Sequence, residues 1–183
     1  VYDGQVGGGI AGGPVGIYTL QSYGFDIELS GMWRFDRGAD KDWKSPDYDD
    51  RMWDQVLVPS PWEKQGFNRM DGQAVYRKAF TLEADQLDED WVLILGLIDD
   101  FDKTYVNGVF VGQTNDGGSY GRSMSFVTLR IYKIPAEVLK KGRNVISVFV
   151  TDIGNVGGIY EGPVGMMPES KYRDFPIERY KRY

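Results

Sequence analysis

Alternation of apolar and polar residues over many short segments is the feature that most limits what this chain can fold into. In residues 25–30, FDIELS, the side chains of Phe25, Ile27 and Leu29 fall on one face of an extended strand and the intervening polar ones on the other. Further stretches rich in β-branched and aromatic residues are 74–82, 91–98, 103–114, 125–134 and 144–152. With little helix elsewhere, these stretches predict an all-β fold of about eight strands, a β-sandwich of jelly-roll type.

Three local patterns refine this expectation. Asn107-Gly108 stands between two alternating stretches, and both central positions of a type I′ turn need a positive φ, so the dipeptide predicts a tight hairpin. Residues 91–98, WVLILGLI, are apolar on both faces, which is typical of a central strand that is covered on both sides. The best candidate for a helix is short, residues 135–142, which begin with proline and end with glycine.

The composition excludes several kinds of chemistry. The 183 residues include no histidine and no cysteine. A Ser-His-Asp triad, a cysteine nucleophile, a histidine-bound zinc ion and a disulfide are therefore impossible within the chain. Catalysis by paired carboxylates and calcium held by oxygen ligands remain open. The net charge of −6 argues against nucleic acid or an anionic membrane as the partner, and no apolar run reaches the roughly 20 residues of a membrane span.

A glycine-rich phrase occurs near both ends of the chain. Residues 1–18 and 150–167 align without a gap and are identical at nine of eighteen positions, Asp3 and Asp152 included. The first copy contains a G-x-G-x-x-G pattern, but Gly-Pro-Val-Gly follows it where a nucleotide-binding loop would need a helix. Repetition at a fixed period is typical of tandem modules, so both copies are expected to be closing loops of sandwich units.

The repeat suggests a division of the chain. Residues 1–28 are expected to be the tail of a preceding related module or a linker, and residues 29–168 the sandwich itself. Residues 169–183 are expected to form a C-terminal strand or a linker to a next domain. This last segment alternates aromatic and basic residues, and the acidic remainder of the chain favours a docking segment over a nucleic-acid contact.

Residues 29–166 resemble a known module. The stretches that carry the resemblance are 47–67 (DYDDRMWDQVLVPSPWEKQGF), 74–80 (AVYRKAF), 96–114 (GLIDDFDKTYVNGVFVGQT) and 132–165, which ends in GGIYEGPVG. They look like the galactose-binding-like jelly-roll domain of family 2 glycoside hydrolases, which also occurs as an accessory domain in sialate O-acetylesterases. IDDFD, VNG and the Gly-Gly-Ile phrase make the esterase type the closer match.

The resemblance implies a role without catalysis, because a separate domain does the chemistry in both families. The chain is then expected to bind a glycan, or to frame the active site of a neighbouring catalytic domain, in a secreted or periplasmic bacterial hydrolase. A structural spacer with no ligand of its own is the alternative.

Candidate ligand-binding residues fall in loops and at strand ends. Trp62 follows Pro61 in a loop, where its ring could stack on a sugar or plug the end of the sandwich. Asp99 and Asp100 come directly after the apolar stretch 91–98 and could accept hydrogen bonds from sugar hydroxyls or solvate a turn. Calcium is the one cofactor left open, with Asp99 and Asp102 as its candidate ligands.

The second glycine-rich phrase supplies the remaining candidates, Asp152, Tyr160 and Glu161. Asp152 has a counterpart in Asp3, which indicates a structural role in orienting the loop, although a contact with ligand is also open. Tyr160 and Glu161 correspond to alanine and glycine in the first copy. Binding that is specific to this unit is therefore expected at these two residues.

Overall fold

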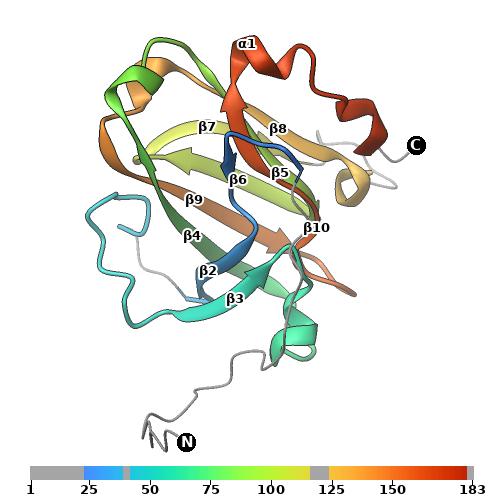
Figure 1. Ribbon diagram of the computed structural model, residues 1–183. Helices are drawn as coiled ribbons and strands as arrows, with labels where there is room; N and C mark the ends of the chain where they lie inside the picture. Colours follow the sequence, from blue (N-terminus) through green and yellow to red (C-terminus); the bar gives the residue numbers. More distant parts are fainter. Residues whose placement is uncertain (1–22, 39–41, 116–123, 181–183) are drawn as a thin grey trace, which may run out of the picture.

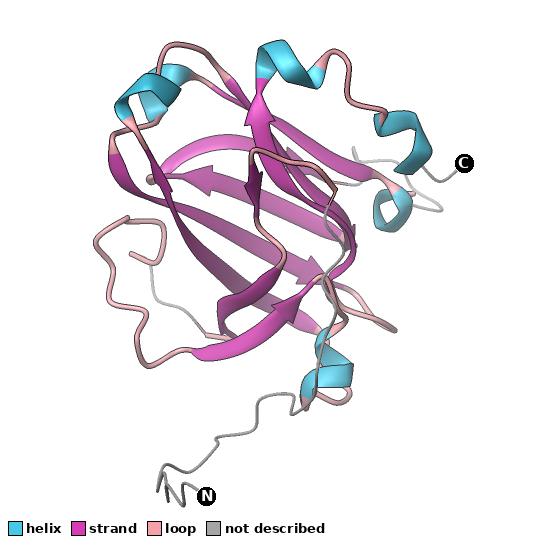
Figure 2. Cartoon of the chain, in the orientation of Figure 1, coloured by secondary structure: helices cyan, strands magenta, loops and turns pink. Residues whose placement is uncertain are grey.

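A computed structural model describes residues 23–38, 42–115 and 124–180, which form two facing antiparallel sheets (Figures 1 and 2). One sheet has four strands in the order β1-β10-β5-β8, and the other has six in the order β3-β2-β4-β9-β6-β7. The strands are β1 (Ile27–Glu28), β2 (Gly31–Asp36), β3 (Asp54–Val58), β4 (Gly72–Leu82), β5 (Trp91–Asp99), β6 (Phe101–Val106), β7 (Val109–Thr114), β8 (Leu129–Ile134), β9 (Gly142–Asp152) and β10 (Gly158–Pro168). The predicted all-β sandwich is confirmed.

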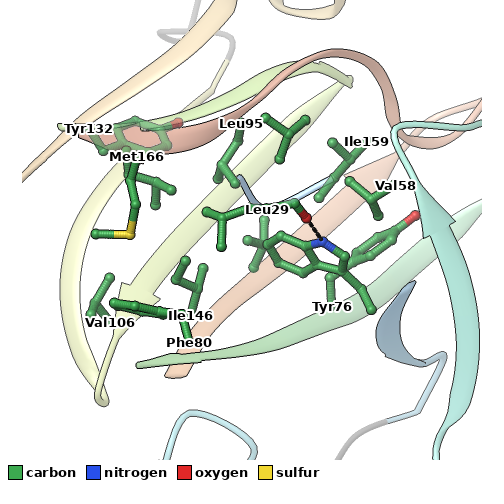
Figure 3. Packing of buried hydrophobic residues seen from close by; sticks show 14 of the residues in the cluster. Leu29, Val58, Tyr76, Phe80, Leu95, Val106, Tyr132, Ile146, Ile159 and Met166 are labelled. Carbon is green, nitrogen blue, oxygen red and sulfur yellow. Dashed lines mark hydrogen bonds between the residues drawn. The ribbon is translucent and has the colours of Figure 1, made fainter. Parts of the chain in front are cut away.

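The core lies between the two sheets (Figure 3). Alternation along β2 turns Trp33 and Phe35 inward, and both are almost completely buried. The indole Nε1 of Trp33 donates a hydrogen bond of 2.8 Å to the carbonyl oxygen of Leu29, so the large ring enters the core without leaving its polar atom unpaired. Leu93 and Leu95 of β5, in the opposite sheet, belong to the same core cluster.

The turn between β6 and β7 agrees with its prediction. Asn107 has a φ of 50° and Gly108 a φ of 85°, as a type I′ turn requires. The side chain of Asn107 also accepts a hydrogen bond from the backbone N–H of Val145 at 3.0 Å, which joins the turn to β9.

Strand β5 is central and covered on both faces, as its continuous apolar sequence predicts. It lies between β10 and β8. Its outward-facing Val92 and Ile94 pack in a second apolar cluster with Phe25 and Ile177. The C-terminal segment supplies this cover through α1 (Glu169–Tyr172) and a 3₁₀ turn at Ile177–Tyr180, and its described part contains no strand.

Two local predictions were wrong. Residues 158–165 are not a closing loop, because they lie within β10, which pairs with β5 through two register shifts. The glycines suit a strand here because aromatic groups lie against the backbone: a Cβ atom at Gly165 would be 2.0 Å from the ring of Phe25. Residues 135–142 form a 3₁₀ turn, Ala136–Val138, in place of the expected helix, and Gly142 already belongs to β9.

Residues 1–22, which hold the first copy of the glycine-rich phrase, lie outside the described residues. Within the described part of the chain, no helix has the length and apolar character needed to cross a membrane.

Candidate functional site

A pocket of about 830 Å³ opens at one end of the sandwich, where strand ends and loops from several parts of the chain meet. The end of β5, the loop between β9 and β10, and two 3₁₀ turns contribute to it. Its lining includes Pro61, Lys64, Asp99, Asp100, Phe126, Tyr160 and residues 153–156. Three of the residues predicted from the sequence, Asp99, Asp100 and Tyr160, are therefore brought together.

Asp100 is fixed in the wall of this pocket. Its side chain is almost fully buried, and Oδ2 accepts a hydrogen bond of 2.9 Å from the backbone N–H of Ile153. Its backbone carbonyl accepts a hydrogen bond of 2.7 Å from Nη2 of Arg130, a buried residue of β8. These two contacts tie the end of β5 to the loop after β9 and to the neighbouring strand.

Asp99 is the pocket group with the most perturbed acidity. Burial is the main cause, and the adjacent charges of Asp100 and Asp152 add to it, so the pKa of the Asp99 carboxyl is raised from 3.8 to about 7. Arg130 acts in the opposite direction but does not cancel the effect. Near neutral pH, Asp99 can therefore either donate or accept a hydrogen bond to a ligand.

Asp152 holds the loop between β9 and β10, which lines the pocket. It is the last residue of β9 and is 2% exposed, and its Oδ1 accepts a hydrogen bond of 2.9 Å from the backbone N–H of Gly154. Burial raises the pKa of the carboxyl, and the charge of Asp100 adds to the increase. Asp152 does not line the pocket, so its contacts fit the loop-orienting role that its sequence position indicates.

Tyr160 and Glu161 have different surroundings although they are consecutive in β10. The hydroxyl of Tyr160 donates a hydrogen bond of 2.6 Å to the carbonyl oxygen of Phe126, which joins two aromatic residues of the pocket lining. Glu161 is outside the lining, and its charge is among the causes that raise the pKa of Tyr23, after burial and Tyr180. Of this pair, only Tyr160 belongs to the candidate site.

Trp62 serves the core. It begins a 3₁₀ turn at Trp62–Gln65, its side chain is 0% exposed, and its indole Nε1 donates a hydrogen bond of 3.0 Å to the carbonyl oxygen of Met70. A Cβ atom at Gly157 would lie 2.1 Å from the ring, so the loop after β9 packs directly on it. Because no face of the ring is free to stack on a sugar, we leave Trp62 out of the site and assign it the role of plugging the sandwich end.

Asp102 is already engaged within the protein. Its buried carboxylate accepts hydrogen bonds from Arg130 Nε at 3.0 Å, from the hydroxyl of Tyr132 at 2.9 Å and from the hydroxyl of Thr104 at 2.9 Å. Among the residues that the structure describes, no group of three or more acidic side chains is arranged to hold a metal ion. Calcium at Asp99 and Asp102 stays a prediction that these contacts do not favour.

Comparison with known proteins places the fold. No protein family and no curated protein matches the chain. Part of a Bacteroides uniformis beta-glucuronidase is similar, with a TM-score of 0.59 and 20% identity over 73% of this chain and 16% of that one. A glycoside hydrolase family 2 member from Bacteroides cellulosilyticus gives a TM-score of 0.58 and 23% identity over 73% and 19% of the two chains. A family 2 beta-glucuronidase gives 0.57 and 21% over 76% and 15%.

The fold is that of a β-sandwich found in family 2 glycoside hydrolases. At these identities the likeness concerns the fold alone. The matches cover only 15 to 19% of the three enzymes, so the sandwich is similar to a small part of each.

Sequence reasoning missed part of this pocket. Phe126 is 40% exposed and Lys64 is exposed, yet neither stands in a pattern that distinguishes it from other surface residues. Phe126 lies in a stretch predicted to be strand, and the structure instead forms a 3₁₀ turn there, Ser125–Val127. Its position beside Tyr160 depends on the packing of β8 next to β5.

Proposed function

We propose that the chain is a non-catalytic module of a carbohydrate-processing hydrolase, and that the end pocket binds a sugar. The observation that carries this proposal is the combination of aromatic surface and carboxylates in one open pocket of about 830 Å³. Sugar rings offer apolar C–H faces and polar hydroxyl edges, and sites of this kind pair apolar lining with a few placed polar groups.

Phe126 and Tyr160 supply the apolar surface. Phe126 is 40% exposed, and the hydrogen bond from Tyr160 to its backbone fixes the two residues relative to each other. Aromatic rings that are fixed before binding lose little conformational freedom when a sugar stacks on them. The carboxyl of Asp99 then receives or donates hydrogen bonds at the hydroxyl edge, and exposed Lys64 and Asn155 complete the polar rim.

The arrangement of acids supports binding over catalysis. Glycoside hydrolysis by two carboxyl groups needs them on opposite sides of the scissile bond. The two acids that line the pocket, Asp99 and Asp100, are consecutive residues at the end of one strand, and Glu161 is outside the lining. We therefore propose that a neighbouring domain of the same polypeptide performs the chemistry, as a glycosidase or as an esterase of the sialate O-acetylesterase type, and that the whole is secreted or periplasmic.

Calorimetric titration of the chain with a panel of neutral, amino and acidic saccharides tests the proposal. Phe126→Ala and Asp99→Asn are expected to weaken binding of any saccharide ligand about tenfold, the effect of losing one stacking or hydrogen-bonding contact. Phe110→Ala is the matched control, because Phe110 has a similar exposure of 50% but lies on β7, outside the pocket.

Two outcomes contradict sugar binding at this pocket. One is a loss of affinity in Phe110→Ala as large as in Phe126→Ala. The other is an absence of binding across the whole panel, which would favour the alternative of a structural spacer that only holds or joins its neighbouring domains.

A further inference from the structure

A second, smaller pocket lies at the six-stranded sheet, where β2 and β4 separate. The two strands pair only over Arg34, Phe35 and Asp36, whereas the preceding residues of β2 pair with β3 alone. The gap leaves a pocket of about 210 Å³, lined in part by Arg34, Lys78 and Arg143. It shares no lining residue with the end pocket and is independent of the function proposed there.

Three of the four cationic residues that line this pocket, Arg34, Lys78 and Arg143, have no carboxylate partner among the residues that the structure describes. Arg34 Nη1 donates to the carbonyl oxygen of Trp53 at 3.3 Å, Lys78 Nζ to that of Met32 at 2.8 Å, and Arg143 Nη1 to that of Pro46 at 2.6 Å. In the described part of the chain, no ion pair includes any of the three. A guanidinium has five N–H donors and an ammonium three, so most of their donors remain for a ligand.

Asp50 is the one carboxylate among the described residues that line the pocket, and it is paired with an arginine. Asp50 accepts a hydrogen bond of 2.7 Å from Nε of Arg77, whose side chain is 1% exposed. Arg77 lies directly opposite Arg34 in the pairing of β4 with β2, and like charges in that position repel each other. The lining therefore keeps an excess of three positive charges, from Arg34, Lys78 and Arg143, in a chain whose net charge is −6.

The charged form of Lys78 is destabilised in this pocket. Lys78 is half-buried, and this burial lowers the pKa of its ammonium group. A bound anion would remove this penalty and the repulsion between the neighbouring cations at the same time.

We infer that this pocket binds a tetrahedral oxyanion, a sulfate or phosphate group that is either free or carried on a saccharide. The pocket has about a quarter of the volume of the end pocket and offers cationic donors from three strands. Arginine and lysine together suit an oxyanion with several acceptor oxygens, since the guanidinium forks bind two oxygens and the ammonium group binds as a point charge.

Thermal unfolding of the whole chain in sodium sulfate, with sodium chloride added to keep the ionic strength constant, tests this inference. A specific site gives a saturable rise in melting temperature, whereas the general effect of sulfate on protein hydration is shared by all variants. Arg143→Gln, at an exposed position, and Lys78→Met are expected to weaken the apparent affinity for sulfate about tenfold each.

Lys64→Gln is the control, because it removes one positive charge from the end pocket and leaves the second pocket intact. An unchanged sulfate response in both Arg143→Gln and Lys78→Met would overturn the inference. So would a response that is lost in Lys64→Gln and kept in the other two variants. Galactose 6-sulfate distinguishes the sources: tighter binding than free sulfate supports an anion carried on a saccharide, and equal binding supports the free ion.

Discussion

Replacing Asp99 with asparagine is expected to stabilise the protein, and to do so mainly at neutral and alkaline pH. The carboxyl of Asp99 has a pKa of about 7 in the folded chain, against an ordinary value of 3.8, because it is partly buried beside Asp100 and Asp152. Between about pH 4 and pH 7 the folded state holds a proton that the unfolded chain has released. The stability of the natural chain therefore falls as the pH rises through this window, and the penalty is complete above it.

The size of the effect follows from the shift. One pKa unit corresponds to about 1.4 kcal/mol, so a rise from 3.8 to about 7 sets an upper limit of about 4 kcal/mol. Asp99 keeps contact with solvent at the pocket wall, and solvent screening reduces the expected gain for Asp99→Asn to about 1–2 kcal/mol at pH 8. At pH 4.5 the gain should fall to about half of its value at pH 8, because the natural side chain is then largely protonated in the folded state.

Urea unfolding of both proteins at pH 4.5 and pH 8 measures this difference. Asp49→Asn is a control of opposite sign: hydrogen bonds from Arg51 lower the pKa of Asp49 to about 2, so its charge favours the folded state above pH 4 and that contribution is lost as the pH falls through 2. It should give no gain at pH 8. A gain for Asp99→Asn that is equal at the two pH values, or a loss at pH 8, would refute the account of the pocket's electrostatics.

Two further predictions concern the packing around the pockets. Tyr132→Phe should lower the free energy of unfolding by about 1–3 kcal/mol, because it leaves the buried Asp102 with one donor fewer. Tyr76→Phe removes a buried hydroxyl that makes no hydrogen bond of normal geometry within the described residues, so it should cost less, and equal losses in urea unfolding would contradict this. Gly157→Ala should cost about 1–3 kcal/mol and shift tryptophan fluorescence to longer wavelength, because its methyl group needs the space of the Trp62 ring, and an unchanged melting temperature would show that the loop can move aside.

Part of the candidate site could be predicted from the sequence. Asp99 and Asp100 were identifiable because charged residues that end an apolar strand must lie at the rim of a sandwich, and Tyr160 because it is where the two copies of the repeat differ. All three line one pocket. The local sequence made Trp62 an equally good candidate. Its ring is buried because the loop after β9 packs on it, and that loop lies about 95 residues away in the chain.

The sequence by itself determined the strands β4 to β7 and β9, because a strand with one buried face must alternate and a strand with two must be apolar throughout. It also determined the hairpin at Asn107-Gly108, where two adjacent residues fix the backbone. Only the tertiary structure decided that the glycine-rich residues 158–168 form a strand, since their glycines lie against aromatic residues far away in the chain, such as Phe25 at Gly165. It likewise decided which aromatic rings stay open to a ligand, because exposure is a property of what packs alongside a residue and not of the residue's own neighbours in sequence.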